Sequence, residues 1–228
     1  MAKAKASKEI IQKHEQMFYP TVRVRTKKAG GSGTVVYSKK HKNEVYTYVI
    51  TNHHVIADSV KIEKKWDSVL KRKVDKENTA DWVANLFPLD DLDNVHIFDE
   101  TYAVGASLGH PPVASNGMIT YMDDEIDSYK YWMSSAPTIF GNSGGAVYRW
   151  SDSRKQYEYI GVPSRISIQP MGFSADAITH MGYFIPIDRV YKLLKENDYH
   201  FIYDKDVSFE DCEKARKKKQ TPEKDEEE

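Results

Sequence analysis

The sequence predicts an all-β fold built from antiparallel barrels, and two observations support that prediction. Residues 22–25 read Val-Arg-Val-Arg and residues 45–50 read Val-Tyr-Thr-Tyr-Val-Ile, so side chains alternate with the period of a half-buried strand. Glycine-containing turns separate further short apolar runs. Because no long helical pattern lies between these runs, neighbouring strands should pair antiparallel and close into barrels.

Short helices are expected at both ends of the strand-rich region. Ser7 can cap a first helix, within an N-terminal extension of residues 1–20. The apolar side of that helix carries Ile10, Ile11, Met17 and Phe18. Asp188 can cap a second helix that stops near Asn197 and closes the fold. Its apolar face carries Ile187, Val190, Tyr191 and Leu194.

Composition bounds the class of protein. The 228 residues suffice for one domain with a substantial core, and double barrels of this size commonly count as one domain. Lys plus Arg number 33 against 34 Asp plus Glu, which gives no pointer to nucleic acid. No apolar run could span a membrane and no secretory signal is visible. Cys212 is the only cysteine, so a reducing compartment and a cytoplasmic location are expected.

The last segment, residues 204–228, contains few apolar residues and ends in a basic run followed by an acidic one. A segment of this composition cannot bury enough apolar surface to offset the entropy of ordering. The sequence therefore predicts a charged, disordered tail. Its basic run could hold an acidic partner, but a solvated tail is the simpler interpretation.

A serine between glycines is the feature that points most directly to chemistry. Residues 141–145 read Gly-Asn-Ser-Gly-Gly and lie directly before an apolar run. Gly141 can adopt a positive φ, while Gly144 and Gly145 leave room for a substrate backbone beside the Ser143 hydroxyl. The pattern predicts a nucleophile on a tight turn, although a flexible loop would have the same composition.

Two adjacent histidines, His53 and His54, follow directly on the predicted strand at residues 45–50. A neutral serine hydroxyl is a weak nucleophile and needs a neighbouring base, and imidazole titrates near physiological pH. A lone histidine at a strand end is more often structural. Together with the later serine turn, this pair favours a catalytic interpretation.

These segments together resemble the trypsin-like serine proteases, most closely the disulfide-free branch typified by the bacterial HtrA/Deg proteases. Residues 51–55, Thr-Asn-His-His-Val, are similar to the family's Thr-x-x-His-Val element. Residues 141–147 resemble its Gly-Asn-Ser-Gly-Gly turn, and residues 182–188 resemble the strand before its terminal helix. The resemblance extends over residues 21–200, and a PDZ domain of the kind that many HtrA relatives carry is not expected.

The resemblance implies two six-stranded antiparallel barrels of the chymotrypsin-like kind within residues 21–203, and a serine endopeptidase acting on a peptide or protein substrate. It implies Ser143 as nucleophile, His54 as general base, and the N–H groups of Gly141 and Ser143 as oxyanion hole. Acyl transfer through an acyl-enzyme requires no metal or organic cofactor. The scattered histidines His96, His110, His180 and His200 show no metal-ligand spacing.

A carboxylate that orients His54 completes the implied triad. Its candidates are Asp58, Asp67, Asp75, Asp81, Asp90, Asp91 and Asp93. Asp81 is favoured because the residues after it could continue as a half-buried strand, whereas Asp75 lies among charged residues. Residues 60–80 are rich in charge and short on alternation, so the first barrel could be shortened.

The implied substrate pocket has two walls. One is formed by Pro137, Thr138, Ile139 and Phe140, and the other by Val162, Pro163 and Ser164. Neither wall carries an acidic residue that would hold a Lys or Arg side chain. Cleavage is therefore expected after small or medium apolar residues.

Two other functions would account for parts of the same sequence. If the orienting carboxylate is missing, the domain would be a catalytically impaired binding module, because that loss costs about ten-thousand-fold in turnover. An esterase of the α/β-hydrolase type would also use a serine between glycines, but there the histidine follows the serine and a helix follows the turn. Here histidine precedes serine and the sequence after the turn is strand-like, so the peptidase is favoured.

Overall fold

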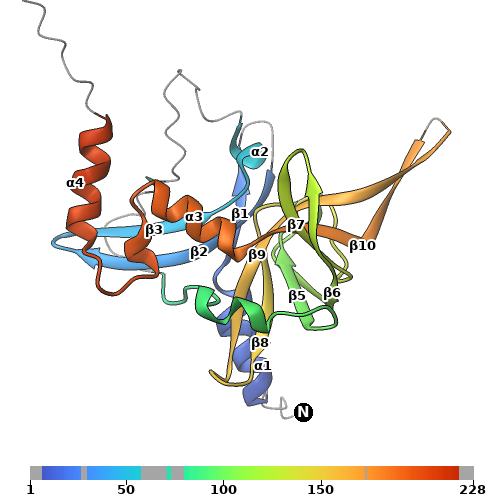
Figure 1. Ribbon diagram of the computed structural model, residues 1–228, viewed down its shortest axis with the longest axis horizontal. Helices are drawn as coiled ribbons and strands as arrows, with labels where there is room; N and C mark the ends of the chain where they lie inside the picture. Colours follow the sequence, from blue (N-terminus) through green and yellow to red (C-terminus); the bar gives the residue numbers. More distant parts are fainter. Residues whose placement is uncertain (1–6, 27–29, 58–70, 73–79, 173, 221–228) are drawn as a thin grey trace, which may run out of the picture. The chain divides into compact units, whose positions relative to one another are not determined.

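The computed structural model describes residues 7–26, 30–57, 71–72, 80–172 and 174–220. It divides the chain into two compact units, residues 1–187 and 188–228. This division differs from the boundaries after residues 20 and 203 that the sequence suggested. Among the described residues, strands predominate in the first unit and helices in the second (Figure 1).

The first sheet contains four antiparallel strands in the described residues, in the order β1-β2-β3-β4. Their bounds are β1 Thr21–Arg25, β2 Gly30–His41, β3 Glu44–Ile50 and β4 Lys71–Arg72. Lys42 turns the chain between β2 and β3 with a φ of 55°. A short helix, α2 (His53–Ile56), follows β3. The described part of this sheet is therefore smaller than a six-stranded barrel, and most of residues 60–80, where shortening was expected, lie outside the described residues.

The second sheet is a closed six-stranded barrel in the order β10-β7-β6-β5-β8-β9, so this part of the prediction is confirmed. Its strands are β5 Glu100–Gly105, β6 Val113–Ile126, β7 Tyr129–Ser134, β8 Ala146–Ser151, β9 Gln156–Met171 and β10 Ser174–Pro186. Val104, Ile119 and Ile160 are fully buried. Alternating apolar positions on successive strands thus supply one barrel core.

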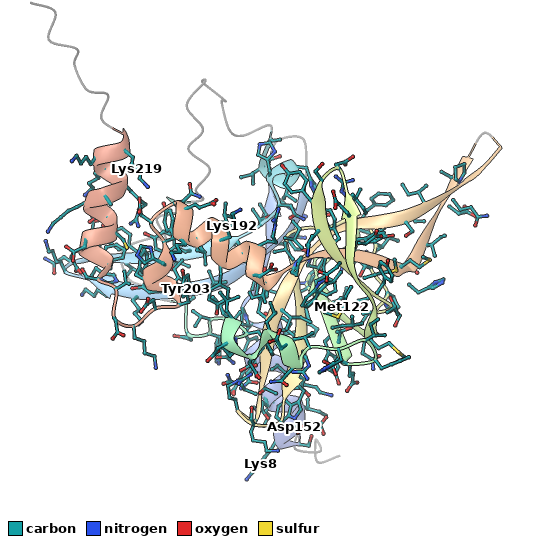
Figure 2. The ribbon with its side chains drawn as sticks, in the orientation of Figure 1. Lys8, Met122, Asp152, Lys192, Tyr203 and Lys219 are labelled. Atoms are coloured by element: carbon teal, nitrogen blue, oxygen red, sulfur yellow. The ribbon has the colours of Figure 1, made fainter. Side chains whose placement is uncertain are left out.

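The predicted N-terminal helix is present as α1 (Lys8–Lys13), which continues into a π-helical turn at His14–Phe18. Ser7 caps α1 by accepting from the Ile10 N–H at 3.3 Å. The Gln12 side chain donates to the Lys155 carbonyl at 2.8 Å, which fixes α1 beside the turn between β8 and β9. Figure 2 shows Asp152 in that turn close to the helix that carries Lys8.

Residues 84–87 connect the first sheet to the barrel. The Ala84 N–H donates to the Val35 carbonyl at 2.8 Å, and the Phe87 N–H donates to the Tyr159 carbonyl at 3.1 Å. Phe87 is fully buried, and the guanidinium carbons of Arg149 and Arg154 lie 5.8 and 5.5 Å from its ring centroid. Cation–π contacts of this length add to the apolar burial.

A buried carboxylate accompanies this connection. Glu158 is fully buried and accepts from Arg154 Nε at 2.6 Å and Arg154 Nη2 at 2.9 Å. Arg154 also pairs with Asp91 at 2.6 Å. These hydrogen bonds raise the pKa of Arg154, with Glu158 as the first cause. The pKa of Asp91 is lowered by hydrogen bonds from Asn94 and then Arg154.

Strands β9 and β10 continue beyond the barrel as a two-stranded arm (Figure 1). The arm turns near Gly172, whose φ is 59°. Strand β8 pairs with β9 only as far as Gly161, so in the described chain the later residues of β9 pair with β10 alone. Ile168 in this arm is 54% exposed.

The second unit contains the predicted closing helix, α3 (Ile187–Glu196), a 3₁₀ turn at His200–Ile202 and a further helix, α4 (Phe209–Gln220). Figure 2 shows Lys192 on α3 and Lys219 near the carboxyl end of α4. No helix in the described ranges is long and apolar enough to cross a membrane.

Helix α4 lies in the segment for which the sequence predicted a disordered tail, and this part of the prediction is corrected for residues 209–220. Phe209, Cys212 and Arg216 are buried along α4. The Arg216 guanidinium carbon lies 4.2 Å from the Tyr199 ring centroid, and the Phe201 and Phe209 rings are 5.1 Å apart. The segment orders because an arginine over aromatic rings replaces the apolar residues that the composition lacks. Residues 221–228 lie outside the described chain.

Candidate active site

The serine turn, defined here as residues 141–145, precedes β8 and holds Ser143 in a fixed backbone. Gly141 and Gly144 have φ values of 99° and 83°, which glycine adopts without strain. Asn142 is 2% exposed, and its Oδ1 accepts from the Ser107 hydroxyl at 2.6 Å. The Gly145 N–H donates to the Asn142 carbonyl at 2.9 Å. These bonds exclude the flexible loop that the composition also allowed.

Ser32 of β2 joins the serine turn to the first sheet. Its fully buried hydroxyl donates to the Gly141 carbonyl at 2.6 Å and accepts from the Ala106 N–H at 2.6 Å. Its N–H donates to the Ser143 carbonyl at 2.9 Å. One residue thus fixes the backbone on both sides of Asn142.

The N–H groups of the serine turn differ in their acceptors. Those of Asn142, Gly144 and Gly145 donate to backbone carbonyls at 2.9 to 3.0 Å. Among the residues that the structure describes, the N–H groups of Gly141 and Ser143 donate to no acceptor. Two donors on alternate residues beside the Ser143 hydroxyl are thus left for another group.

The direction of the Gly141 N–H follows from the preceding peptide. The Phe140 carbonyl accepts from the Leu108 N–H at 2.7 Å. Because the C=O and N–H of a trans peptide point in opposite directions, the Gly141 N–H points away from Leu108. Leu108 itself has a φ of 51°, an unusual conformation for a leucine.

The segment that carries His54 is attached to the serine turn through shared partners. The Pro163 carbonyl accepts from the Gly144 N–H at 3.0 Å and from the Asn52 side-chain amide at 2.6 Å. The Thr51 hydroxyl donates to the Ser32 carbonyl at 2.6 Å. Helix α2, which contains His54, therefore begins against the turn that contains Ser143.

Gly31 separates these two segments at close range. A Cβ on Gly31 would lie 2.6 Å from a Val55 methyl and 3.0 Å from the Ser143 carbonyl oxygen. Only glycine allows α2 and the serine turn to approach this closely. His54 directly precedes Val55 on α2. The segment that carries His54 and the segment that carries Ser143 therefore both approach Gly31 of β2.

His54 makes no hydrogen bond to Ser143 in the described part of the chain, where the Ser143 hydroxyl lies 3.5 Å from the Ser164 carbonyl. Catalytic hydrogen bonds are often loose before substrate binds. His54 is solvent-exposed, but partial desolvation lowers its pKa, and the charges of His53 and then Arg165 act in the same direction. A lowered pKa keeps the imidazole neutral and able to accept a proton at neutral pH.

Asp81 is not brought to His54. Its side chain is exposed, and its neighbour Ala80 donates its N–H to the Ser38 hydroxyl at 2.8 Å. Ser38 and the site residue Ser32 are about 20 Å apart along an extended strand. Of the other candidate aspartates, Asp90, Asp91 and Asp93 lie in a 3₁₀ turn at Leu89–Asn94, and Asp58, Asp67 and Asp75 lie outside the described residues.

The two predicted walls of the substrate pocket differ in burial. Thr138 is 7% exposed, and a Cβ on Gly182 would lie 2.9 Å from the Thr138 side chain. Val162 and Pro163 are buried, and Ile139 and Ser164 are half-buried. Pro137 and Phe140 are exposed, so they contribute little to an enclosed wall.

The sequence did not indicate Ser32, Ser107 or Leu108 as site residues. Each forms a hydrogen bond to the serine turn or to the adjoining Phe140 from a distant segment. The donor is a hydroxyl or a backbone N–H that every serine or leucine has, so residue type alone gives no signal. The short Gly-Ser-Gly stretch around Ser32 was the one available signal.

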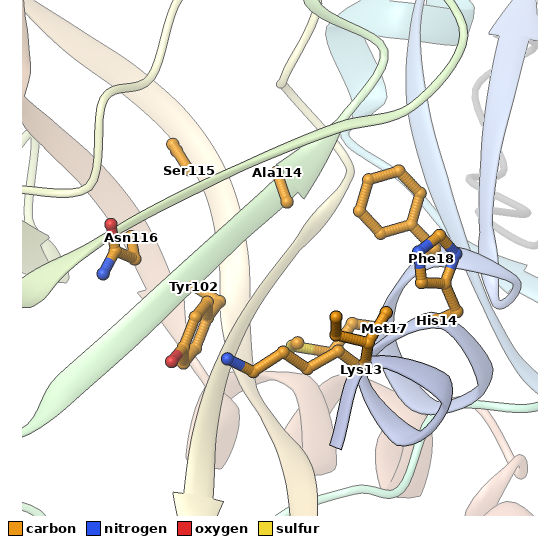
Figure 3. A pocket seen from close by; sticks show the side chains of 9 residues that line it. Lys13, His14, Met17, Phe18, Tyr102, Ala114, Ser115 and Asn116 are labelled. Atoms are coloured by element: carbon orange, nitrogen blue, oxygen red, sulfur yellow. The ribbon is translucent and has the colours of Figure 1, made fainter. Parts of the chain in front are cut away.

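A separate pocket of about 410 Å³ lies between the N-terminal helical segment and strands β5 and β6 (Figure 3). Lys13 Nζ in its wall pairs with Glu9 at 2.9 Å and lies 5.0 Å from the Tyr102 ring centroid. Burial, and then a hydrogen bond to Glu100, raises the pKa of Tyr102 to about 12. None of the residues predicted for catalysis lines this pocket.

No protein-family model matches this chain, and no curated protein matches it in sequence. Solved structures do match. The HtrA-type protease AlgW with a tripeptide is 17% identical, with a TM-score of 0.56 over 82% of this chain and 62% of that one. The serine endoprotease from Yersinia pestis is 18% identical, with a TM-score of 0.54 over 84% of this chain and 67% of that one. This chain therefore spans 62% of the length of the AlgW structure. The likeness establishes the fold, and the chain has the chymotrypsin-like fold of the HtrA-type serine proteases.

Proposed function

We propose that the protein is a serine endopeptidase in which Ser143 is the nucleophile and His54 the general base. The observation that carries the proposal is the pair of N–H groups at Gly141 and Ser143 that donate to no acceptor in the described chain. They belong to the turn that carries the proposed nucleophile, and the backbone of that turn is fixed from both sides. An oxyanion hole requires backbone donors that are left for the developing charge.

In the proposed reaction, the Ser143 hydroxyl attacks a peptide carbonyl while His54 takes its proton. The carbonyl oxygen gains negative charge and accepts hydrogen bonds from the Gly141 and Ser143 N–H groups, each worth about 3 kcal/mol of barrier. His54 then donates its proton to the leaving amine, which leaves an ester on Ser143. Water, activated by His54, hydrolyses that ester and restores the enzyme.

The substrate pocket supports cleavage after a small or medium apolar residue. Thr138 is packed against Gly182, and its N–H donates to the Thr179 carbonyl at 2.7 Å, so that wall is fixed. The walls contain no acidic residue. The neighbouring AlgW structure holds a tripeptide, and we propose peptides as the substrates here.

The role predicted for Asp81 is tested on its own. If Asp81 oriented His54, Asp81→Asn would slow turnover about ten-thousand-fold. Its position beside Ser38, about 20 Å along β2 from Ser32, predicts a small effect instead. Rates of hydrolysis for the wild type and Asp81→Asn decide between these outcomes.

An unfolded protein substrate tests the proposed function. The wild type should yield new N-termini, identified by mass spectrometry, preceded in the substrate by apolar residues of small or medium size. Ser143→Ala and His54→Ala should yield none. Failure of the wild type to cleave, with binding of the substrate retained, would support the alternative of a catalytically impaired binding module. The observation that favours this alternative is that Asp81 is exposed and that its neighbour Ala80 bonds to Ser38, away from Ser32 on β2.

A further inference from the structure

Strand β9 changes register beside the nucleophile. Pro163 is opposite Phe184 and Arg165 is opposite Tyr183, so Ser164 has no partner on β10. The Ser164 carbonyl is 3.5 Å from the Ser143 hydroxyl. Such a bulge re-aims a backbone group, here toward the nucleophile. The residue of a bound peptide that is attacked by Ser143 would therefore lie beside Ser164.

The rest of β9 offers an edge for that peptide. Strand β8 pairs with β9 only up to Gly161, and the later residues of β9 pair only with β10 within the described chain. An edge of this kind binds an extended peptide through backbone hydrogen bonds. All pairs of named strands in the barrel are antiparallel. If the peptide pairs with β9 in the antiparallel direction as well, the residues before its scissile bond lie beside Arg165 and then Ile166.

Arg165 is the one charged residue in the stretch 162–170 of β9. Its Nη2 pairs with Asp127 Oδ2 at 2.8 Å, and its guanidinium carbon lies 5.3 Å from the Tyr131 ring centroid. The Arg165 and Asp127 side chains are 42% and 69% exposed. An exposed pair of this kind is weak, and a guanidinium has donors left for a second carboxylate.

The positive charge of Arg165 also contributes, after partial desolvation and the charge of His53, to the lowered pKa of His54. Arg165 directly follows Ser164, whose carbonyl is 3.5 Å from the Ser143 hydroxyl. A negative side chain beside it would be attracted, and a positive one would be repelled.

We propose that Arg165 makes the enzyme select substrates with Asp or Glu as the second residue before the scissile bond. This selection rests on the proposed function, and it refines the substrate class. The residue next to the scissile bond enters the space beside Thr138, and its acidic predecessor meets Arg165.

The test uses the full chain and three peptides of equal length with valine before the scissile bond. The peptides differ only in the residue before that valine, which is Glu, Gln or Lys. We expect kcat/KM for the Glu peptide to exceed that for the Gln peptide about fivefold, the size expected for one exposed ion pair. The Lys peptide should be the poorest.

Variants assign the preference to Arg165. Arg165→Gln should equalise the Glu and Gln peptides, and Arg165→Glu should favour the Lys peptide. Lys130→Gln is the matched control, because Lys130 is an exposed cation that pairs with Asp123 at 3.7 Å on the neighbouring hairpin. It should keep the wild-type preference. An equal rate for the Glu and Gln peptides in the wild type, or a Glu preference that survives in Arg165→Gln, would overturn the proposal.

A binding measurement separates this proposal from the proposed function. Dissociation constants of the same peptides for Ser143→Ala, with and without Arg165→Gln, require no turnover. If the wild type cleaves but neither rate nor binding depends on the Glu side chain, selection by Arg165 is wrong and the peptidase stands. If the wild type does not cleave, the peptidase is wrong, and a Glu preference in binding that is lost with Arg165→Gln still supports the acidic subsite.

Discussion

The Asn52 side-chain amide donates a 2.6 Å hydrogen bond to the Pro163 carbonyl, the same oxygen that accepts the Gly144 N–H. Asn52 immediately precedes the helix that carries His54, and Gly144 immediately follows Ser143. One carbonyl of β9 thereby sets the position of the proposed base relative to the proposed nucleophile. Misplacement by an ångström at such a site can cost about a hundredfold in rate.

Asn52→Ala should therefore slow reaction of Ser143 with a fluorophosphonate probe by about 10- to 100-fold. Loss of the buried bond should also lower the free energy of unfolding by about 1 to 2 kcal/mol. Asn85→Ala is the control, since Asn85 also donates from its amide to a β9 carbonyl, that of Tyr157 at 3.2 Å. A labelling rate for Asn52→Ala equal to that of Asn85→Ala would refute the positioning role.

Ser32→Ala should affect the serine turn specifically. It leaves the Gly141 carbonyl and the Ala106 N–H without their buried partner, at a cost of about 1 to 3 kcal/mol in stability. It should also slow labelling of Ser143, because the Gly141 peptide is no longer fixed. Ser38→Ala removes another serine of β2 that bonds to Thr47 and Ala80. If both variants lose stability but react with the probe at the wild-type rate, the Ser32 hydrogen bonds do not position Ser143.

The pH dependence of labelling reports the state of His54. Partial desolvation and the charges of His53 and Arg165 disfavour the imidazolium, so the pKa of His54 is lowered. Only the neutral imidazole accepts the proton of Ser143. The labelling rate should therefore fall on acidification with a midpoint below about 6.5, the ordinary value for histidine. Arg165→Gln should move that midpoint upward, and a midpoint above 6.5 in the wild type would contradict the assigned electrostatics.

Arg154→Met tests the ion pair between the buried Glu158 carboxylate and the solvent-accessible Arg154 guanidinium. Glu158 is fully buried, and the substitution leaves its carboxylate without the guanidinium that it accepts from twice. The Gln156 amide still donates to Glu158 at 2.7 Å, so the expected cost is that of an incompletely satisfied buried carboxylate, about 1 to 3 kcal/mol. Lys155→Met removes an exposed cation that pairs with Asp152 at 3.5 Å and should change stability little. Equal unfolding midpoints in denaturant for the two variants would show that the Arg154 pair is not stabilising.

Much of the fold could be predicted because it follows from local patterns. Alternation at residues 22–25 and 45–50 marked two strands of the first sheet, and both are present as β1 and β3. The second barrel closes with six strands, as the family resemblance implied. Period-two patterns and turn glycines lie within a few residues of the structure that they determine.

The unpredicted features depend on contacts between distant segments. Ser32 bonds to Gly141 and Ala106, which are 109 and 74 residues away in sequence. Helix α4 was missed because Arg216 counted as a charge, whereas its guanidinium covers the Tyr199 ring in the fold. A sequence pattern classifies arginine as a solvent-exposed residue, because its partners in the fold are not yet known. In the fold, aromatic rings bury Arg216.

The central claim is that Ser143 is activated by His54. Its most direct measurement is the intact mass of the full chain after treatment with a fluorophosphonate, with the modified residue mapped by peptide sequencing. We expect one phosphonyl adduct, on Ser143, in the wild type, and no adduct in Ser143→Ala or His54→Ala. An unmodified wild-type chain, or an adduct that persists in His54→Ala at the wild-type rate, would contradict the account.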